Sequence, residues 1–183
     1  MSKIRKPRGG LKIILPDLLV HDLKVVFCGM AASTVSAKRQ AYYAGPGNKF
    51  WDVIYQAGLT PVRLEPEAYR EALKYGIGFT DMIKDQSGMD SQLSQDQVDR
   101  QSVTEKILQY APAVLCFNGK KAAQRYWGIA ASGGVRYGEQ PLTIGHTIVF
   151  VLPSTSGAAN RWWNEKYWLE AAACIKARHA EKQ

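Results

Sequence analysis

The stretch Lys24-Val-Val-Phe-Cys-Gly-Met30 is a short apolar run, rich in residues that favour strands, and it stops at a glycine. Such a run predicts a buried parallel strand that feeds a loop, because a strand covered on both faces lacks polar alternation. Two later runs have the same form, Pro112-Ala-Val-Leu-Cys-Phe-Asn118 and Thr147-Ile-Val-Phe-Val-Leu152. Both lead into loops of small and polar residues.

Helical patterns lie between and after these runs, over residues 48–58, 97–110, 120–127 and 162–180. In the last of them, Trp163, Tyr167 and Trp168 are expected to pack on the sheet. Strands that alternate with helices predict the α/β class: a single three-layer α/β/α sandwich with a central, mostly parallel four-stranded sheet. The polar stretch from Lys84 to Asp96 is predicted to be the one long loop.

The charge of the chain suits a polyanionic partner. Its 183 residues hold 24 Lys and Arg against 16 Asp and Glu, with a net charge of +8. Residues 1–12 are predicted to form a basic, flexible segment and residues 13–180 a single domain. The basic segment is interpreted as a solvated terminus, with a phosphate-touching arm as the alternative.

No apolar stretch resembles a signal peptide or is long enough to span a bilayer. The cysteines, Cys28, Cys116 and Cys174, are far apart in apolar surroundings and predict buried thiols in a reducing compartment. We therefore expect an intracellular protein of the cytoplasm or nucleoid. We expect no cofactor, because neither the cysteine nor the histidine spacing suits zinc or an iron–sulfur cluster.

Two loops of unusual composition follow predicted strands, Gly29-Met-Ala-Ala-Ser33 and Pro153-Ser-Thr-Ser-Gly-Ala-Ala159. In an open α/β sheet, ligands bind at the carboxyl ends of the strands, so both loops are expected at one edge. Their backbone N–H groups could hold an anion. Many nucleotide and phosphate sites share this property.

Together, several segments resemble the uracil-DNA glycosylase superfamily, and within it the mismatch-specific branch that holds thymine-DNA glycosylase and the double-strand uracil glycosylases. The most specific pieces are Gly45-Pro-Gly-Asn-Lys-Phe-Trp51 and Tyr75-Gly-Ile-Gly-Phe-Thr80. The others, in chain order, are Leu15-Pro-Asp-Leu-Leu19, Val26-Phe-Cys-Gly29, Phe117-Asn-Gly-Lys120 and Pro153-Ser-Thr-Ser156. The resemblance runs from about residue 15 to residue 160.

This resemblance implies a monofunctional DNA glycosylase of base excision repair, which flips a damaged base out of DNA. Its partner would be DNA containing uracil or other damaged bases, and it would act as a monomer. The base would enter a cleft between the turns Met30–Ser33 and Ser154–Asn160, where backbone amides stabilise the departing anion. No matched lysine is placed to form a Schiff base, so the product would be an abasic site.

The resemblance places the catalytic positions at Ala31, Asp81 and Ser154. Where the family normally carries a water-activating Asn, this chain has Ala31, and Ala32-Ser33 replace the Pro-Gly that follows. An alanine side chain accepts no hydrogen bond and cannot orient water. Asp81 is the nearest acid that could substitute, and a helix N-cap is the alternative interpretation.

The resemblance also implies the binding residues. Tyr43 matches the aromatic residue on which the flipped base stacks, a turn or core tyrosine being the alternative, and Asn48 fits a pocket or loop-bracing role. The full set of expected substrate contacts is Gly29, Met30, Ala32, Tyr43, Asn48, Ser154, Thr155 and Ser156. The expected DNA contacts are Gly157, Ala158, Ala159, Asn160, Arg161 and Lys120; alanines make a small wedge, so Arg161 could fill the duplex or grip a phosphate.

Two rival functions remain open at this point. The first is a catalytically weak or inactive protein of the same fold that binds uracil or abasic DNA, since Ala31 removes the usual water-orienting group. The second is an α/β enzyme that acts on a free nucleotide, which the lack of a G-x-x-x-x-G-K-[ST] or G-x-G-x-x-G pattern disfavours. A looser pocket around Ala31, Ala32 and Gly45 would also admit lesions bulkier than uracil.

Overall fold

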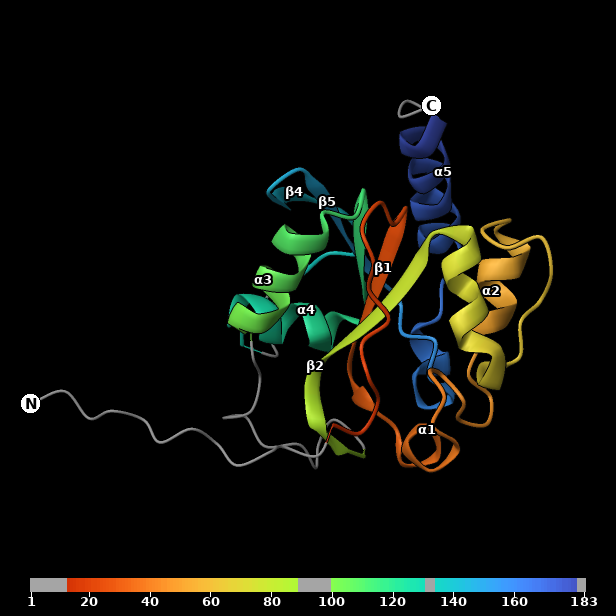
Figure 1. The fold of residues 1–183 in the computed structure, drawn as a ribbon. Helices are drawn as coiled ribbons and strands as arrows, with labels where there is room; N and C mark the ends of the chain where they lie inside the picture. Colours follow the sequence, from red (N-terminus) through yellow and green to blue (C-terminus); the bar gives the residue numbers. More distant parts are fainter. Residues whose placement is uncertain (1–12, 89–99, 131–133, 181–183) are drawn as a thin grey trace, which may run out of the picture.

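A computed structural model describes residues 13–88, 100–130 and 134–180. Its described part contains one five-stranded sheet in the order β2-β1-β3-β5-β4, in which β4 is antiparallel to β5 and the other neighbouring pairs are parallel (Figure 1). The strands are β1 (Val25–Ala32), β2 (Ile77–Ser87), β3 (Val114–Asn118), β4 (Gly138–Ile144) and β5 (Thr147–Leu152). The helices are α1 (Thr34–Arg39), α2 (Phe50–Gln56), α3 (Arg100–Tyr110), α4 (Lys120–Trp127) and α5 (Lys166–Ala180), with 3₁₀ helices η1 (Pro66–Tyr75) and η4 (Gly157–Trp162).

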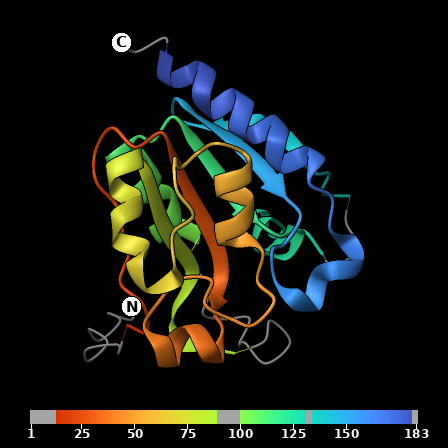
Figure 2. The same cartoon turned by 90° about the vertical axis from the view of Figure 1, so that its right-hand side faces the viewer.

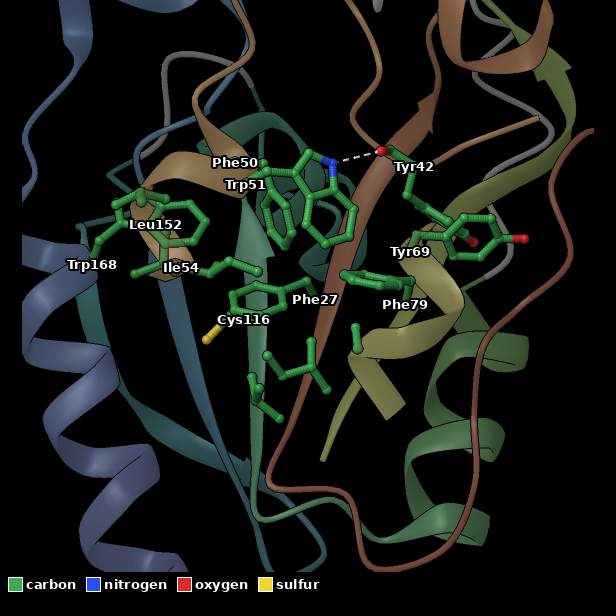
Figure 3. Packing of buried hydrophobic residues seen from close by; sticks show 14 of the residues in the cluster. Phe27, Tyr42, Phe50, Trp51, Ile54, Tyr69, Phe79, Cys116, Leu152 and Trp168 are labelled. Carbon is green, nitrogen blue, oxygen red and sulfur yellow. Dashed lines mark hydrogen bonds between the residues drawn. The ribbon is translucent and has the colours of Figure 1, made fainter. Parts of the chain in front are cut away.

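Helices cover both faces of the sheet, which confirms the predicted three-layer α/β/α sandwich. On one face lie α2, η1 and α5 (Figure 2). Their aromatic side chains pack with those of the sheet: Phe27 is stacked on Trp168 at 5.6 Å between ring centroids and meets Phe50 edge-on at 5.0 Å (Figure 3). Trp168 is fully buried, as its place in the final amphipathic pattern predicts.

The opposite face is covered by α3 and α4. Side chains of β1 alternate between the layers, since Val25 and Phe27 belong to the aromatic cluster whereas Val26 and Cys28 pack with α3 and α4. Strands buried on both faces are continuous apolar runs, which is why the sequence 24–30 reads as it does. Cys28 and Cys116 are buried free thiols, and Cys174 is partly buried.

The sheet has five strands where the sequence predicts four, and strand β1 is longer than predicted. It continues past Gly29 to Ala32 because β2 pairs with it there, Gly29 opposite Asp81 and Ala31 opposite Ile83. The prediction that a loop begins at Gly29 is therefore wrong, since residues 29–32 belong to β1. A glycine does not end a strand when a neighbouring strand continues the hydrogen-bond ladder.

Two expectations around β2 are also wrong. Lys84 to Ser87, predicted as the start of a loop, form the end of this strand, and the remainder of that loop from residue 89 lies outside the described residues. Asp81 lies within β2, so the helix N-cap interpretation is excluded. Strand β2 accommodates the polar residues from Lys84 to Ser87 because it is the edge strand of the sheet and these last residues are partly buried or exposed.

The predicted helices 48–58 and 120–127 are confirmed by α2 and α4, and α3 begins at Arg100, with 97–99 outside the described residues. The final helix is shorter than predicted, because η4 ends at Trp162 and α5 begins only at Lys166. The basic segment 1–12 also lies outside the described residues. Within the described ranges, no helix combines the length and apolar character needed to cross a membrane.

Candidate active site

The carboxyl ends of three neighbouring strands bring Gly29, Asp81 and Asn118 to one edge of the sheet. Gly29 of β1 is paired with Asp81 of β2, and Asn118 ends β3 on the other side of β1. A Cβ built on Gly29 would lie 2.7 Å from Asp81 Oδ1 and 3.7 Å from the hydroxyl of Tyr43. Because Gly29 has no side chain, there is room above the strand for the Asp81 carboxyl and, slightly farther away, for the Tyr43 hydroxyl.

Tyr43 holds its ring in place from a turn that precedes α2. Its backbone is left-handed, with φ of 55°, and its ring is stacked on Phe50 at 4.0 Å between centroids and 20° between planes. The Tyr43 hydroxyl is buried and has no hydrogen-bond partner among the residues that the structure describes. Burial and the charge of Asp81 raise the pKa of Tyr43 well above its ordinary value; Asn118 approaches closely enough to offset part of that rise without forming a well-directed bond.

The Asp81 carboxyl is almost fully buried, with 5% of its side chain exposed, and its Oδ2 lies 3.4 Å from Lys84 Nζ. Burial raises the pKa of Asp81 above the ordinary value of an aspartate, although the Lys84 ammonium partly opposes the rise. A carboxyl with a raised pKa is a stronger base when ionised. This is the usual way in which an acidic side chain is adapted for general-base work near neutral pH.

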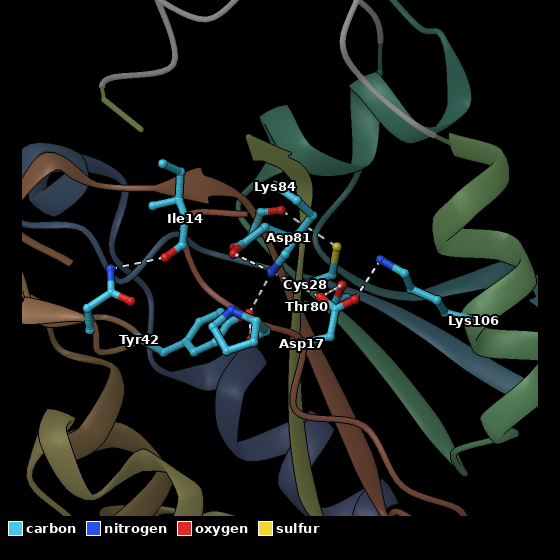
Figure 4. Close-up of polar contacts among 11 residues, drawn as sticks. Ile14, Asp17, Cys28, Tyr42, Thr80, Asp81, Lys84 and Lys106 are labelled. Carbon is cyan, nitrogen blue, oxygen red and sulfur yellow. Dashed lines mark hydrogen bonds and ion pairs between the residues drawn. The ribbon is translucent and has the colours of Figure 1, made fainter. Parts of the chain in front are cut away.

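Lys84 connects Asp81 to a second acid, Asp17 (Figure 4). Its ammonium donates to Asp17 Oδ1 at 2.9 Å and to the hydroxyl of Tyr42 at 2.9 Å. Burial would lower the pKa of Lys84, but the two carboxylates outweigh burial and raise it. Lys84 is therefore a protonated side chain, paired on two sides.

Asp17 receives a second cation, since Lys106 of α3 lies 2.6 Å from Asp17 Oδ2. Burial would raise the pKa of Asp17, but Lys84 and Lys106 together hold it below its ordinary value. The segment that carries Asp17 is held against the outer edge of β2 by an antiparallel bridge between Leu18 and Phe79. This pairing explains structurally why the stretch from Leu15 to Leu19 belongs with the site.

The loop after β5 is tied to β3 through a reciprocal pair of hydrogen bonds. Asn118 Nδ2 donates to Thr155 Oγ1 at 2.9 Å, and the Thr155 N–H donates to Asn118 Oδ1 at 3.0 Å. The Ser156 N–H donates to Ser154 Oγ at 3.3 Å. These two amides, expected to face the base, are thus engaged within the protein, and Thr155 is a buried brace of the loop.

The turn from Gly45 to Asn48 lies between the two segments that the sequence places around the substrate. A Cβ on Gly45 would be 3.7 Å from Ser33 Oγ, and one on Gly47 would be 3.8 Å from Gly157 Cα. The residues following β1 and those following β5 therefore lie on the same side of the molecule. Asn48 Oδ1 accepts from the Phe50 N–H at 3.0 Å, which is the loop-bracing arrangement.

The remaining predicted residues of β1 are placed differently from one another. Met30 is buried in the cluster on the α3 and α4 face, so only its backbone could meet a substrate at the Tyr43 face. Ala31 is partly exposed and Ala32 is buried. Ser33 is exposed, and its hydroxyl caps α1 by accepting from the Ser36 N–H at 3.0 Å.

The predicted DNA contacts lie mostly on η4. Ala158, Asn160 and Arg161 are exposed. Asn160 Oδ1 accepts from the ammonium of Lys49, which ties η4 to the start of α2. Lys120, at the beginning of α4, is partly buried and lies 4.2 Å above the ring centre of Tyr137.

Reasoning from the sequence missed four residues of this site: Asp17, Tyr42, Lys84 and Asn118. A signal for Lys84 exists in the sequence, because it follows the largely apolar stretch Ile77–Ile83 and comes three residues after the acid Asp81. Asn118 ends an apolar run in the same manner as Gly29. Tyr42 and Asp17 carry no such signal, since their partners lie far away in the chain.

Comparison with known proteins agrees with this geometry. The family model described as the uracil DNA glycosylase superfamily matches residues 16–177. Among solved structures, the chain is similar to the solution NMR structure of a candidate uracil DNA glycosylase from Methanosarcina acetivorans, with a TM-score of 0.58 and 24% sequence identity. The match covers 88% of this chain and 96% of the other. At that identity the structural match establishes the shared fold.

Proposed function

The chain belongs to the uracil DNA glycosylase superfamily, and we propose that it is a monofunctional DNA glycosylase that removes uracil from DNA in base excision repair. The observation that carries the proposal is that an almost fully buried Asp81 carboxyl and a buried Tyr43 hydroxyl, which has no hydrogen-bond partner among the described residues, both lie close to the Cβ position of Gly29. A buried hydroxyl without a partner is costly unless a ligand or water completes it. Both groups lie at the sheet edge where α/β proteins bind ligands.

In the proposed reaction, the bond between C1′ of deoxyribose and N1 of uracil breaks, and its electron pair leaves with the base. Water adds its oxygen to C1′ and gives a proton to the ionised Asp81 carboxylate. The base leaves as the uracil anion, and the proton held by Asp81 is returned to it, directly or through solvent. The products are then free uracil, an abasic deoxyribose in an unbroken strand and the ionised Asp81. Positive charge builds on the sugar and negative charge on the base, so fixed dipoles near the base act as the charges develop.

Asp81 takes the role that an Asn at position 31 of β1 would otherwise fill. The Ala31 side chain has no hydrogen-bond acceptor. Asp81 has one, and it lies on the adjacent strand, opposite Gly29, with its carboxyl close to the Cβ position of that glycine. A carboxylate accepts a proton, which an amide does not, so the exchange turns an orienting group into a base. General-base catalysis of this kind typically contributes about 10²- to 10⁴-fold to the rate.

Tyr43 is proposed to receive the flipped base. Phe50 is stacked on one face of its ring, and we propose that the flipped base stacks on the other. The hydroxyl would then meet the base or the attacking water. The core residue Phe50 supports the Tyr43 ring, and the two hydrogen bonds between Asn118 and Thr155 hold the loop after β5. Both parts of the proposed site therefore have a fixed geometry.

We propose an abasic site as the product, without strand cleavage. A lysine that attacks C1′ must be neutral, yet the nearest buried lysine, Lys84, is held protonated between Asp17 and Asp81. Treating the reaction with borohydride should therefore trap no covalent complex between protein and DNA. A trapped complex would contradict this part of the proposal.

The test is single-turnover excision on oligonucleotides with U·G, U·A and single-stranded uracil, followed by alkaline cleavage of abasic sites. Asp81→Asn should slow excision about a hundredfold or more while leaving uracil-DNA binding in place. Asp22→Asn is the matched control, because Asp22 is exposed and precedes β1 at the other end of the strand. Unchanged excision by Asp81→Asn would show that Asp81 does not activate water.

The pocket also predicts a lesion range. The small residues Ala31 and Gly45 are proposed to leave room beside the base, so 5-substituted uracils, ethenocytosine and deaminated purines belong in the substrate panel. Strict preference for uracil would contradict a loose pocket. Likewise, Tyr43→Ala should weaken both excision and the binding of uracil-containing DNA, and intact binding would remove Tyr43 from the site.

A second candidate function is a protein that binds uracil or abasic DNA without cleaving it. Ala31 favours it, because the group that usually orients water is absent. The two candidates separate cleanly when the protein is in excess over DNA. Abasic sites that form under that condition support the enzyme, and tight binding without any abasic product supports the binding protein.

A further inference from the structure

Two consecutive tryptophans mark the end of the 3₁₀ helix η4: Trp162, its last residue, is exposed, and Trp163, which follows it, is partly buried. Trp163 is partly buried, lies 6.1 Å from Trp168 and has the ammonium of Lys49 5.5 Å above its ring centre. Trp162, its neighbour, is 65% exposed, the highest value among the large apolar side chains of the described residues. A single exposed apolar side chain is ordinary on a protein surface. Trp162 is distinguished by its place at the end of a turn that several contacts hold, directly after the exposed Arg161.

Three contacts fix η4 against the site. The carbonyl of Thr155, just before η4, accepts from the Lys49 N–H at 2.9 Å, and the Lys49 ammonium binds Asn160. Gly157 fits closely against the neighbouring turn, since a Cβ there would be 3.2 Å from the carbonyl oxygen of Pro46. Figure 2 shows η4 at the same end of the sheet as the tip of β1 and as α1. The helix η4, which ends at Trp162, is therefore held beside the turn that leads into α2.

The charge around Trp162 suits nucleic acid. Residues 140–164 contain no Asp or Glu, and the guanidinium of Arg161 lies 5.5 Å from the centre of the Trp162 ring. An aromatic ring beside a cation is the combination that binds a stacked base and its phosphate. The alanines at 158 and 159 are too small to fill the space that a flipped nucleotide leaves.

We propose that Trp162 stacks on the base left unpaired opposite the flipped nucleotide, while Arg161 contacts the adjoining phosphate. This inference rests on the proposed function and names the group that holds the duplex open. In a 3₁₀ helix the rise is about 2 Å per residue, so Trp162 lies roughly 10 Å along the axis from Gly157. The flipped nucleotide and its former partner belong to one base pair and lie across the duplex from each other, so a loop that meets the flipped nucleotide near Gly157 needs a separation of this kind to place Trp162 at the opposite strand.

The test removes either the Trp162 ring from the protein or the opposing base from the DNA. Single-turnover excision is measured for the wild type, Trp162→Ala and Trp162→Phe on uracil opposite guanine, uracil opposite a tetrahydrofuran abasic analogue, and single-stranded uracil. Trp162→Ala should lose about tenfold or more on U·G, since one base–aromatic stack contributes at least that order. It should match the wild type on the other two substrates, where no opposing base exists, and Trp162→Phe should keep most of the U·G rate.

Tyr55→Ala is the matched control, because Tyr55 is an exposed aromatic residue on α2, and it should leave all three rates unchanged. Three results would overturn the inference: an unchanged U·G rate in Trp162→Ala, an equal loss on all three substrates, or a phenylalanine variant as slow as the alanine one. If the wild type excises uracil from none of them, the proposed function fails instead. Stacking is then read from the fluorescence of 2-aminopurine opposite an abasic analogue, where quenching that depends on Trp162 supports the inference and its absence overturns it.

Discussion

Replacing Gly29 by alanine tests the candidate site most directly, because the new methyl group would enter the space between Asp81 and Tyr43. The Cβ would lie 2.7 Å from Asp81 Oδ1, about 0.7 Å inside ordinary van der Waals contact, which begins at 3.4 Å. The carboxyl is packed among Gly29, Lys84 and the core, so it must move by most of that difference. The backbone of β1 accepts an alanine, since Gly29 has no positive φ.

The size of the effect follows from two opposing contributions. Overpacking typically costs about 1–3 kcal/mol, and exchanging a strand glycine for alanine recovers roughly 0.5–1 kcal/mol of backbone entropy. We expect a net loss of about 1–2 kcal/mol in the free energy of unfolding, which for a chain of this length lowers Tm by roughly 2–8 °C. Excision should fall more steeply, by about ten- to a hundredfold, since misplacing a catalytic group by about 1 Å can cost a hundredfold.

The assay is single-turnover excision of uracil, with thermal unfolding measured on the same samples. Gly134→Ala is the matched control: no atom lies within 4 Å of its Cβ position, and both quantities should stay at their wild-type values. The double variant Gly29→Ala with Asp81→Asn should be no slower than Asp81→Asn alone, because both changes act on one carboxyl. Additive losses, or wild-type excision by Gly29→Ala, would refute the assignment of Asp81 to the reacting water.

Lys84→Met should move the acidic limb of the pH–rate profile to higher pH. Asp81 must be ionised to act, burial already raises its pKa, and removing the opposing ammonium raises that pKa further. Lys106→Met is the control, since within the described residues Lys106 forms its ion pair with Asp17 and not with Asp81; equal shifts in both variants would contradict the mechanism. Tyr43→Phe should slow excision but leave Tm unchanged or slightly higher, because the lost hydroxyl has no hydrogen-bond partner within the described part of the chain. A lower Tm with unchanged excision would mean that the hydroxyl serves the fold only.

The sequence predicts the inner strands of the sheet well and its edges poorly. Strands β1, β3 and β5 are apolar because helices cover both of their faces, and this is visible as continuous runs. Strand β4 is mostly exposed and contains Pro141, so its pattern resembles a loop. Strand β2 is obscured at its end by a run of polar, partly exposed side chains, of which Lys84 belongs to the ion cluster.

The candidate site divides in the same way. Tyr43 and Asp81 could be predicted because short motifs of the family contain them. The contact between Asp81 and Gly29 depends on the register of two parallel strands, which no local pattern encodes. Asp17 meets Thr80 across 63 positions of the chain, through a segment that forms only an isolated bridge with β2. Contacts of that kind are products of the tertiary fold.

The exchange of an Asn on β1 for an acid on β2 has electrostatic consequences that explain the rest of the cluster. A lone buried carboxyl would hold its proton and could not act as a base. Lys84 supplies the charge that keeps Asp81 ionisable, but a buried ammonium needs more than one partner, and Asp17 provides the second.

Asp17 in turn would carry an excess of negative charge beside Asp81 without Lys106. The four side chains together carry two positive and two negative charges, so the cluster is neutral as a whole and no member is left buried and unpaired. An aspartate at position 81 without Lys84 would therefore have a still higher pKa, and it would activate water only at a pH above the range in which the wild type works.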